Sequence, residues 1–342
     1  MPTKASIKIA QLGCGYWGPN LTRCFNTSDR CTLSDLVEPD PKRRQFVAKN
    51  FPNVSLHESP QPVLEDKSVQ AIIVSTPVST HYKLVKDALN AGKHVFVEKP
   101  LASSYNEARE LADLAAAKSL ILMVGHTFVY NDAVRYLKKL LEQGELGEVF
   151  YTYNQRLNLG QVRKDVNVWW NLAPHDISIL LFLFPDILPT SGTASGRDVL
   201  QTGLEDVVFA NLQWNSQLST HLHMSWLDPN KVRRMTIVGQ KKMVIYDDMA
   251  QDKIAIIDKG YETVPTIGSE MHFDTPGQTL VQRHGDITLP HIQYREPLKN
   301  ERDHFLDCIE TGDTPISGGE NGCQVVRILE DVQTQLDKNK KS

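Results

Sequence analysis

Cysteine is scarce in this chain, and the few cysteines present do not form a pattern typical of disulfide or metal sites. The 342 residues include five cysteines, an odd number, with no C-x-x-C spacing among them. Disulfide-rich domains need paired cysteines, and structural zinc sites need closely spaced ligands. His221 and His223 alternate on one predicted strand, but no third ligand is spaced with them. We therefore expect no disulfide framework and no metal site, and the composition fits a reducing cytoplasm.

Long apolar runs and an excess of one charge are also missing. The most apolar stretch, 177–184, is far too short to cross a bilayer, and no long apolar segment follows Lys4 as in a signal peptide. Lysine and arginine number 37 against 41 aspartates and glutamates, a net charge of −4. We therefore expect a soluble cytoplasmic protein that binds neither nucleic acid nor membrane. The length is sufficient for two domains.

What the sequence does contain is a glycine motif at the junction of a first strand and a first helix. The apolar run 7–12 is followed by Gly13-Cys14-Gly15-Tyr16-Trp17-Gly18. In this G-x-G-x-x-G spacing the first glycine permits a tight turn, the second lets the backbone approach a pyrophosphate, and the third lets the helix pack close to the strand. The N-terminus of the following helix favours phosphate groups. The motif therefore predicts a dinucleotide-binding unit.

The second predicted strand, 32–37, ends in an acidic residue that bears on the choice of cofactor. Glu38 follows Gly18 at the distance where a carboxylate accepts hydrogen bonds from the adenosine ribose and repels a 2′-phosphate. Arg43 and Arg44 lie close enough in sequence to weaken that preference. NAD is therefore the favoured cofactor, and NADP stays open.

The pattern of predicted elements changes near residue 125. Strands and helices alternate through residues 1–124, which predicts a doubly wound parallel sheet, the Rossmann arrangement, as an NAD(P)-binding domain. Residues 125–342 are predicted to form an α+β domain for substrate binding and oligomerisation on a large open, mainly antiparallel sheet. Turn signals at Gly239-Gln240 and Lys259-Gly260 bound its predicted hairpins, and 261–298 are predicted as loop with short strands. The last helix can pack back on the first domain.

Polar motifs follow three of the predicted buried strands. They are Thr76-Pro77 with His81, Glu98-Lys99-Pro100, and Gly125-His126. Open parallel sheets bind ligands outside the carboxyl ends of their strands. The proline after Lys99 restricts this lysine to extended backbone geometry, which aims its side chain into the cleft. The alternative is a solvated lysine at a strand end.

Together with a helix that bears Trp170-Asn171-Leu172-Ala173-Pro174-His175-Asp176, these motifs resemble the glucose–fructose oxidoreductase, inositol dehydrogenase and MocA (Gfo/Idh/MocA) oxidoreductases. The resemblance runs along nearly the whole chain, and the E-K-P motif is quite specific. It implies hydride transfer between NAD(P) and a secondary alcohol or ketone of a sugar, cyclitol or nucleotide sugar. It also implies a homodimer or homotetramer, which fits an open apolar sheet face that needs covering.

The resemblance implies that Lys99 binds the reacting hydroxyl and that His175 is the acid/base group. An imidazole can take the hydroxyl proton while the ammonium stabilises the alkoxide. Both are needed at one carbon, so we expect them to meet across the domain cleft. Asn171 stands where many family members have an aspartate and cannot take a proton. Asp176 can reach Lys99 or orient His175.

Other candidate contacts precede the catalytic helix or lie on it. Trp170, with Trp169, could stack on a nicotinamide or sugar ring or pack in a core. Arg156 and Arg163 would contact a substrate phosphate, with solvated loop charges as an equal alternative.

Two rival functions remain compatible with these residues. One is a reductase in deoxysugar assembly that draws hydride from NADPH. The other is a non-catalytic NAD(P)-binding sensor or regulator of the same fold. Asn171 favours the sensor, whereas the presence of Lys99 and His175 favours catalysis.

Overall fold

The computed structural model describes residues 6–185, 187–214, 218–265 and 278–340. The chain divides into two compact units. The first unit comprises residues 1–131, 174–182 and 295–331, and the second comprises 132–173, 183–294 and 332–342. None of the helices among the described residues is long and apolar enough to cross a membrane.

The first unit is built on a six-stranded parallel sheet with the order β3-β2-β1-β4-β5-β6. Its strands are β1 (Ile7–Leu12), β2 (Cys31–Val37), β3 (Ser55–His57), β4 (Ala71–Val74), β5 (His94–Glu98) and β6 (Leu122–Gly125). The order reverses beside β1, the point at which doubly wound sheets bind dinucleotides. The predicted Rossmann arrangement is therefore confirmed, with β3 as an additional edge strand.

Helices from both ends of the chain pack on this sheet. They are α1 (Gly18–Asn26), α2 (Pro41–Asn50), α3 (Gln61–Glu65), α4 (His81–Asn90), α5 (Tyr105–Ala117), α8 (Pro297–Thr311) and the part of α9 (Gly319–Asn339) up to residue 331, with short 3₁₀ turns η1 (Val78–Thr80) and η2 (Thr127–Tyr130). Phe25 of α1, Phe96 of β5 and Phe305 of α8 meet edge to face, with ring centroids 5.7 to 6.5 Å apart. Such aromatic contacts fix α8 to the sheet.

The segment before α9 also joins the sheet of the first unit. The N–H of Val124 in β6 donates to the carbonyl of Ser317 over 2.7 Å, and Met123 forms an antiparallel bridge with Gly318. The first turns of α9 therefore start beside the carboxyl end of β6.

The second unit is built on an eight-stranded sheet with the order β14-β13-β12-β11-β7-β10-β9-β8. Its strands are β7 (Val149–Leu159), β8 (Ser191–Arg197), β9 (Val207–Gln213), β10 (Ser219–Ser225), β11 (Leu227–Gly239), β12 (Met243–Asp247), β13 (Ile254–Pro265) and β14 (Gln278–Thr288). Among the described strands, β7 and β10 pair in parallel and the other neighbours are antiparallel. The predicted mainly antiparallel sheet is confirmed. Helix α6 (Asp132–Glu142) and the start of α7 (Val168–Leu183) belong to this unit.

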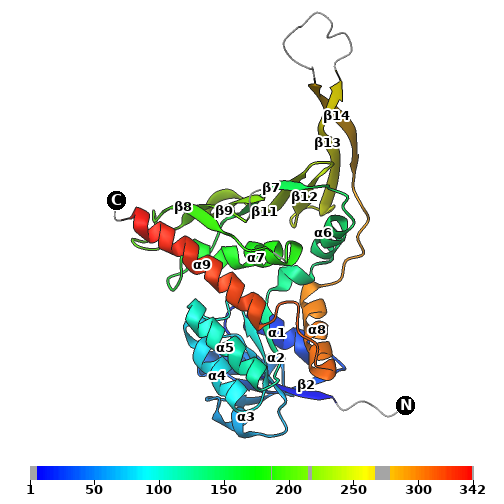
Figure 1. Cartoon of the computed structure of the whole chain (residues 1–342). Coiled ribbons are helices and arrows are strands. Elements are labelled where there is room, and N and C mark those ends of the chain that lie inside the picture. Colours follow the sequence, from blue (N-terminus) through cyan, green and yellow to red (C-terminus); the bar gives the residue numbers. More distant parts are fainter. Residues whose placement is uncertain (1–5, 186, 215–217, 266–277, 341–342) are drawn as a thin grey trace, which may run out of the picture. The chain divides into compact units, whose positions relative to one another are not determined.

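One predicted turn in this sheet is wrong, and one is confirmed. The chain turns between β11 and β12 after Gly239, as expected, but β13 continues through Lys259 and Gly260 and pairs with β14 (Figure 1). The pairing register shifts between Ile257 and Lys259, which marks a bulge, and glycine within a strand often marks such an irregularity rather than a turn. The predicted loop 261–298 therefore contains the end of β13 and the whole of β14, and its residues 266–277 lie outside the described part of the chain.

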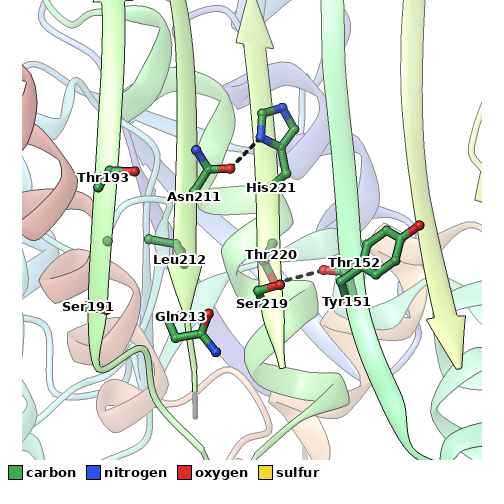
Figure 2. Close-up of a pocket in the computed structure, with 11 residues that line it drawn as sticks. Tyr151, Thr152, Ser191, Thr193, Asn211, Leu212, Gln213, Ser219, Thr220 and His221 are labelled. Carbon is green, nitrogen blue, oxygen red and sulfur yellow. Dashed lines mark hydrogen bonds between the residues drawn. The ribbon is translucent and has the colours of Figure 1, made fainter. Parts of the chain in front are cut away.

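One face of the sheet at β7, β10, β9 and β8 carries exposed side chains. Figure 2 shows a hollow there, lined by Thr193, Asn211, His221 and Tyr151 among others, with the Asn211 Oδ1 atom 2.8 Å from the His221 ring. Nearby, Phe209 is 40% exposed and stacks on His223 with a centroid distance of 4.2 Å. Polar and aromatic side chains therefore share this face.

Candidate cofactor and catalytic site

The glycine motif forms a close-packed turn between β1 and α1. Gly13 has a φ of +89°, and a Cβ there would stand 2.6 Å from Thr76 Cγ2 and 2.8 Å from the Ser75 carbonyl oxygen. Its N–H donates to the carbonyl of Val37, and its carbonyl accepts from the Ser75 hydroxyl over 2.7 Å. Only glycine fits both the left-handed backbone and this contact.

A buried glutamine braces this turn, and the sequence motif did not reveal it. The amide nitrogen of Gln11 donates to the carbonyls of Gly13 and Gly18 over 2.9 and 3.2 Å. Thr22 completes the network by donating to the Gln11 amide oxygen. Trp17, the N-cap of α1, makes no side-chain cap hydrogen bond. The Gln11 and Thr22 side chains thus fix the first turn of α1, and the N-terminus of a helix is suited to binding a phosphate.

Glu38 lies at the end of β2 against the same turn. Its side chain accepts hydrogen bonds from the N–H groups of Cys14 over 2.7 Å and Asp40 over 3.0 Å, and the residue is only 3% exposed. The Arg43 guanidinium stands 4.0 Å from this carboxylate and 3.7 Å from a Cβ built on Gly15. The carboxylate is therefore fixed beside the glycine turn, with an exposed cation next to it.

The second arginine near Glu38, Arg44, stabilises the segment that precedes α2. Arg44 donates to the carbonyls of Glu38 and Pro39, each over 2.7 Å, and it forms an ion pair with Glu58. Its guanidinium therefore holds the start of α2, whereas Arg43 lies over the turn.

His81 connects the two strand ends that follow β4 and β5. Its Nε2 lies 2.9 Å from the carbonyl oxygen of Thr76 and its Nδ1 lies 2.8 Å from that of Pro100. The ring is 1% exposed, and burial lowers its pKa. The Thr76 hydroxyl accepts a hydrogen bond from Thr80 over 2.7 Å. His81 thus ties Thr76-Pro77 to the segment that carries Lys99.

Lys99 directly follows β5 at the carboxyl edge of the parallel sheet and is partly exposed. Glu98, the last residue of β5, is in register with Gly125, the last residue of β6. His126 comes next and is fully buried, and its pKa is lowered to about 3 by burial and by the Lys99 ammonium. The lysine thus lies beside a neutral imidazole and a glutamate.

His175 and Asp176 lie in the part of α7 that belongs to the first unit, as Lys99 does. The His175 ring meets Phe128 of η2 edge to face, with centroids 4.9 Å apart, and its carbonyl accepts from the Ser178 hydroxyl. Asp176 is 3% exposed. The structure therefore gathers Lys99, His175 and the glycine turn in one compact unit.

The other predicted substrate contacts belong to the second unit. Trp170 and Asn171 lie in the first turn of α7, which Asn167 caps by accepting from the Trp170 N–H. Arg156 is 5% exposed within β7, whereas Arg163 is exposed and forms a two-fold ion pair with Asp165 over 2.6 and 2.8 Å. The two arginines therefore differ sharply in surroundings.

A polar row on the buried face of β7 adds Thr152 and Asn154, which sequence reasoning missed, to the predicted Arg156. Thr152, Asn154 and Arg156 alternate along this strand and are all buried. Neither amide atom of Asn154 makes a hydrogen bond among the described residues. A row of polar side chains on a buried strand face is unusual, because buried polar atoms normally find partners.

Metal and disulfide chemistry find no support in the described part of the chain. No group of three or more His, Cys, Asp or Glu side chains there could hold a metal ion. All five cysteines are buried and free.

Comparisons with known proteins identify the family. The sequence model of the oxidoreductase family with an NAD-binding Rossmann fold (Gfo/Idh/MocA) matches residues 7–126, and that of the Gfo/Idh/MocA C-terminal domain matches 134–245. The parallel sheet and the glycine turn, together with the first of these matches, define an NAD-binding Rossmann protein of an oxidoreductase family. The chain belongs to the Gfo/Idh/MocA family.

Relatives of assigned activity include scyllo-inositol 2-dehydrogenases and 2,7-anhydro-N-acetylneuraminate hydratases. The chain is 23% identical to scyllo-inositol 2-dehydrogenase (NAD(+)) of Bacillus subtilis over 91% of this chain and 88% of that protein. It is 28% identical to the NADP(+)-dependent scyllo-inositol 2-dehydrogenase of the same organism, over 56% and 54%. Alignments with the first four curated relatives span only 31% to 60% of those proteins' lengths.

The fold is shared with solved structures along the whole chain. UDP-N-acetylglucosamine 3-dehydrogenase from Acidithiobacillus ferrooxidans superposes with a TM-score of 0.79, covering 98% of this chain and 99% of that one at 23% identity. At this identity the likeness shows the fold alone.

Proposed function

We propose that the protein is an NAD-dependent dehydrogenase of a secondary alcohol on a sugar, cyclitol or nucleotide sugar. The observation that carries this proposal is the placement of Lys99 and the glycine turn on one sheet edge. The turn follows β1, Lys99 follows β5, and β4 alone separates these strands. A cofactor bound at the carboxyl edge would therefore lie within reach of the lysine.

The residues fit a nicotinamide dinucleotide. Gly13 permits the tight turn, and a Cβ on Gly15 would meet only the Arg43 guanidinium among the described residues, at 3.7 Å, so the backbone at Gly15 is open to a pyrophosphate, with Cys14, Tyr16 and Trp17 completing the turn. Glu38 would bind the adenosine ribose. Thr76 and Pro77 would line the cofactor edge, while His81 and Glu98 would hold the segments that bear Thr76 and Lys99.

In the proposed reaction the substrate carbinol loses a hydride and a proton and becomes a ketone. NAD⁺, when bound, supplies the hydride acceptor. The His175 imidazole takes the hydroxyl proton, and the Lys99 ammonium donates a hydrogen bond to the developing alkoxide. Reduction of a ketone is the same sequence reversed.

Substrate selection would come from Arg156, Trp170, Asn171 and Asp176. Asn171 offers a hydrogen bond to a sugar hydroxyl but no charge. Buried Arg156 suits a fixed anionic or multiply hydroxylated group, whereas Arg163 would first have to leave its ion pair with Asp165.

Buried reduced cysteines support a cytoplasmic location.

The test of this proposal is turnover of a substrate panel. NADH formation would be followed with inositols, free sugars and nucleotide sugars, and NAD(P)H consumption with the corresponding ketones. We expect turnover with at least one polyol-type class. Tight NAD binding without turnover of any class would instead favour the non-catalytic sensor, which Asn171 alone supports.

Cofactor choice supplies a separate prediction. Glu38→Gln keeps the shape of the side chain but removes the charge that repels a 2′-phosphate, together with one of the two oxygens that accept from Cys14 and Asp40, so the preference for NAD⁺ over NADP⁺ should fall by about tenfold. Arg43→Gln is the matched change: it should weaken NADP⁺ and leave NAD⁺ unaffected. Fluorescence titration of both cofactors measures the ratio of dissociation constants. An unchanged ratio in Glu38→Gln contradicts this role.

We further propose that two copies associate through the open sheet face. Phe209 and the surrounding aromatic and polar side chains offer a mixed surface of the kind found in protein interfaces. Phe209→Glu should lower the apparent mass in light scattering to that of a single chain, with Phe46→Glu as an exposed control on α2. A mass unaffected by Phe209→Glu would exclude this face.

A further inference from the structure

Glu98 places a carboxyl group at the carboxyl end of β5, in a space that a glycine provides. A Cβ on Gly125 would lie 3.2 Å from Glu98 Oε1 and 3.3 Å from its Cδ. Oε1 is shielded from solvent and makes no hydrogen bond within the described residues. The carboxyl group therefore rests on the bare backbone of β6.

Glu301 of α8 places a second carboxyl group against Thr127, two residues after Gly125 on the same segment. The residue is fully buried, and its Oε2 accepts a hydrogen bond from the Thr127 hydroxyl over 2.8 Å. Its Oε1 is also buried and makes no hydrogen bond among the described residues. Both glutamates thus lie against the short segment 125–127.

The environment opposes ionisation of both groups. Burial raises the pKa of Glu98 to about 7, although the Lys99 ammonium acts in the opposite direction. Burial and the charge of Glu98 raise the pKa of Glu301 well above its usual value. Two neighbouring buried carboxylates repel each other, so the second proton is hard to remove.

The neighbouring titratable groups come from five elements or their ends. They are Lys99 after β5, His126 after β6, Tyr130 of η2, Cys24 of α1 and Arg302 of α8. Burial keeps His126, Tyr130 and Cys24 neutral near pH 7, since it lowers the histidine pKa and raises the other two pKa values. The Arg302 guanidinium donates to the Cys24 carbonyl and to Asp303. Lys99 is therefore the cation whose charge acts on Glu98.

We propose that Glu98 and Glu301 form a carboxyl pair that always shares at least one proton and so carries at most one negative charge, and that this charge positions the Lys99 ammonium. Glu98 and Glu301 are positioning residues in this arrangement. The shared proton is inferred from the two glutamates alone, whereas its effect on Lys99 rests on the proposed function.

The pair should make stability depend on pH in a defined direction. In the unfolded chain a glutamate loses its proton near pH 4.5, whereas the folded pair keeps its protons to about pH 7 or above. The folded state then binds more protons, so the free energy of unfolding falls as pH rises through this window and is highest below it.

The test compares Glu98→Gln, Glu301→Gln and the double variant by urea unfolding at pH 5 to 7. Relative to the double variant, the slope of unfolding free energy against pH should correspond to about two extra protons in the wild type and about one in each single variant. Exposed Glu148→Gln should keep the wild-type slope. Equal slopes in the wild type and the double variant would overturn the shared proton.

A measurement on the unmodified protein covers the case in which a variant does not fold. At pH 7 the exposed carboxyl groups are ionised, so infrared spectra should contain the C=O band of a protonated, buried acid. Absence of this band would overturn the proposed proton shared by Glu98 and Glu301.

The effect on Lys99 has its own readout. With a turned-over substrate, kcat/KM of the wild type should rise with pH near 7 as Glu98 ionises, and Glu98→Gln should lose this rise. An unchanged pH profile would overturn the link to Lys99. Absence of any turnover would defeat the proposed function, while the stability slopes would still decide on the shared proton.

Discussion

Lys99→Met should lower kcat/KM for the alcohol substrate by about 10²- to 10³-fold, the usual effect of removing one group that stabilises a forming oxyanion. Methionine keeps most of the length and apolar stem of lysine but carries no charge. Because Lys99 is proposed to act on the alkoxide rather than on the dinucleotide, the dissociation constant of NAD⁺ should change by no more than about twofold.

Steady-state NADH formation and NAD⁺ titration on the same preparation separate these two effects. Lys83→Met on α4 is a suitable control, because the Lys83 side chain is 78% exposed. If Lys99→Met turns over substrate like the control, the assignment of Lys99 fails. If it loses NAD⁺ binding to the same extent as activity, the lysine serves the cofactor instead.

Gly13→Ala should abolish NAD⁺ binding and destabilise the fold. The methyl group would enter a space bounded by Thr76 Cγ2 at 2.6 Å and the Ser75 carbonyl oxygen at 2.8 Å, and the φ of +89° is already unfavourable for alanine. Strain and overpacking each cost about 1 to 3 kcal/mol. The turn must therefore shift away from the position that presents its backbone to a pyrophosphate.

Gly92→Ala isolates the backbone contribution. Gly92 has a similar φ of +75°, but a Cβ there meets nothing within 4 Å. Urea unfolding should therefore show a smaller loss of stability, about 1 kcal/mol, and NAD⁺ titration should be unaffected. Equal losses of stability in the two variants, with NAD⁺ binding retained in both, would contradict a functional role for the close packing around Gly13.

Strong local patterns made the parallel sheet predictable. Strands such as 71–74 are continuous apolar runs because both faces are buried, and turn residues bound them clearly. The edge strand β3 has three residues, too few to show a period. The strand residues Lys259-Gly260, which follow the bulge, resemble a turn in sequence because glycine occurs in both, and only the pairing with β14 distinguishes them.

The candidate site was predictable where its chemistry lies in a short motif. Lys99 and Glu38 are marked by strand ends and glycine spacing, and His175 by the family resemblance. Gln11 and Glu301 could not be found in this way, because their partners are distant in sequence. Thr127 and Glu301 come together only when α8 packs beside η2. A buried glutamine in a strand and a glutamate in a helix have no local signal of their own.

Transfer of a deuterium label tests hydride transfer at a carbinol carbon most directly. A substrate identified in the panel would be prepared with deuterium on the carbon that bears the reacting hydroxyl, and the reduced cofactor would be analysed by mass spectrometry. The proposed reaction predicts one deuterium on the nicotinamide ring for each ketone formed, and a rate that collapses in Lys99→Met. Unlabelled cofactor alongside converted substrate would contradict it.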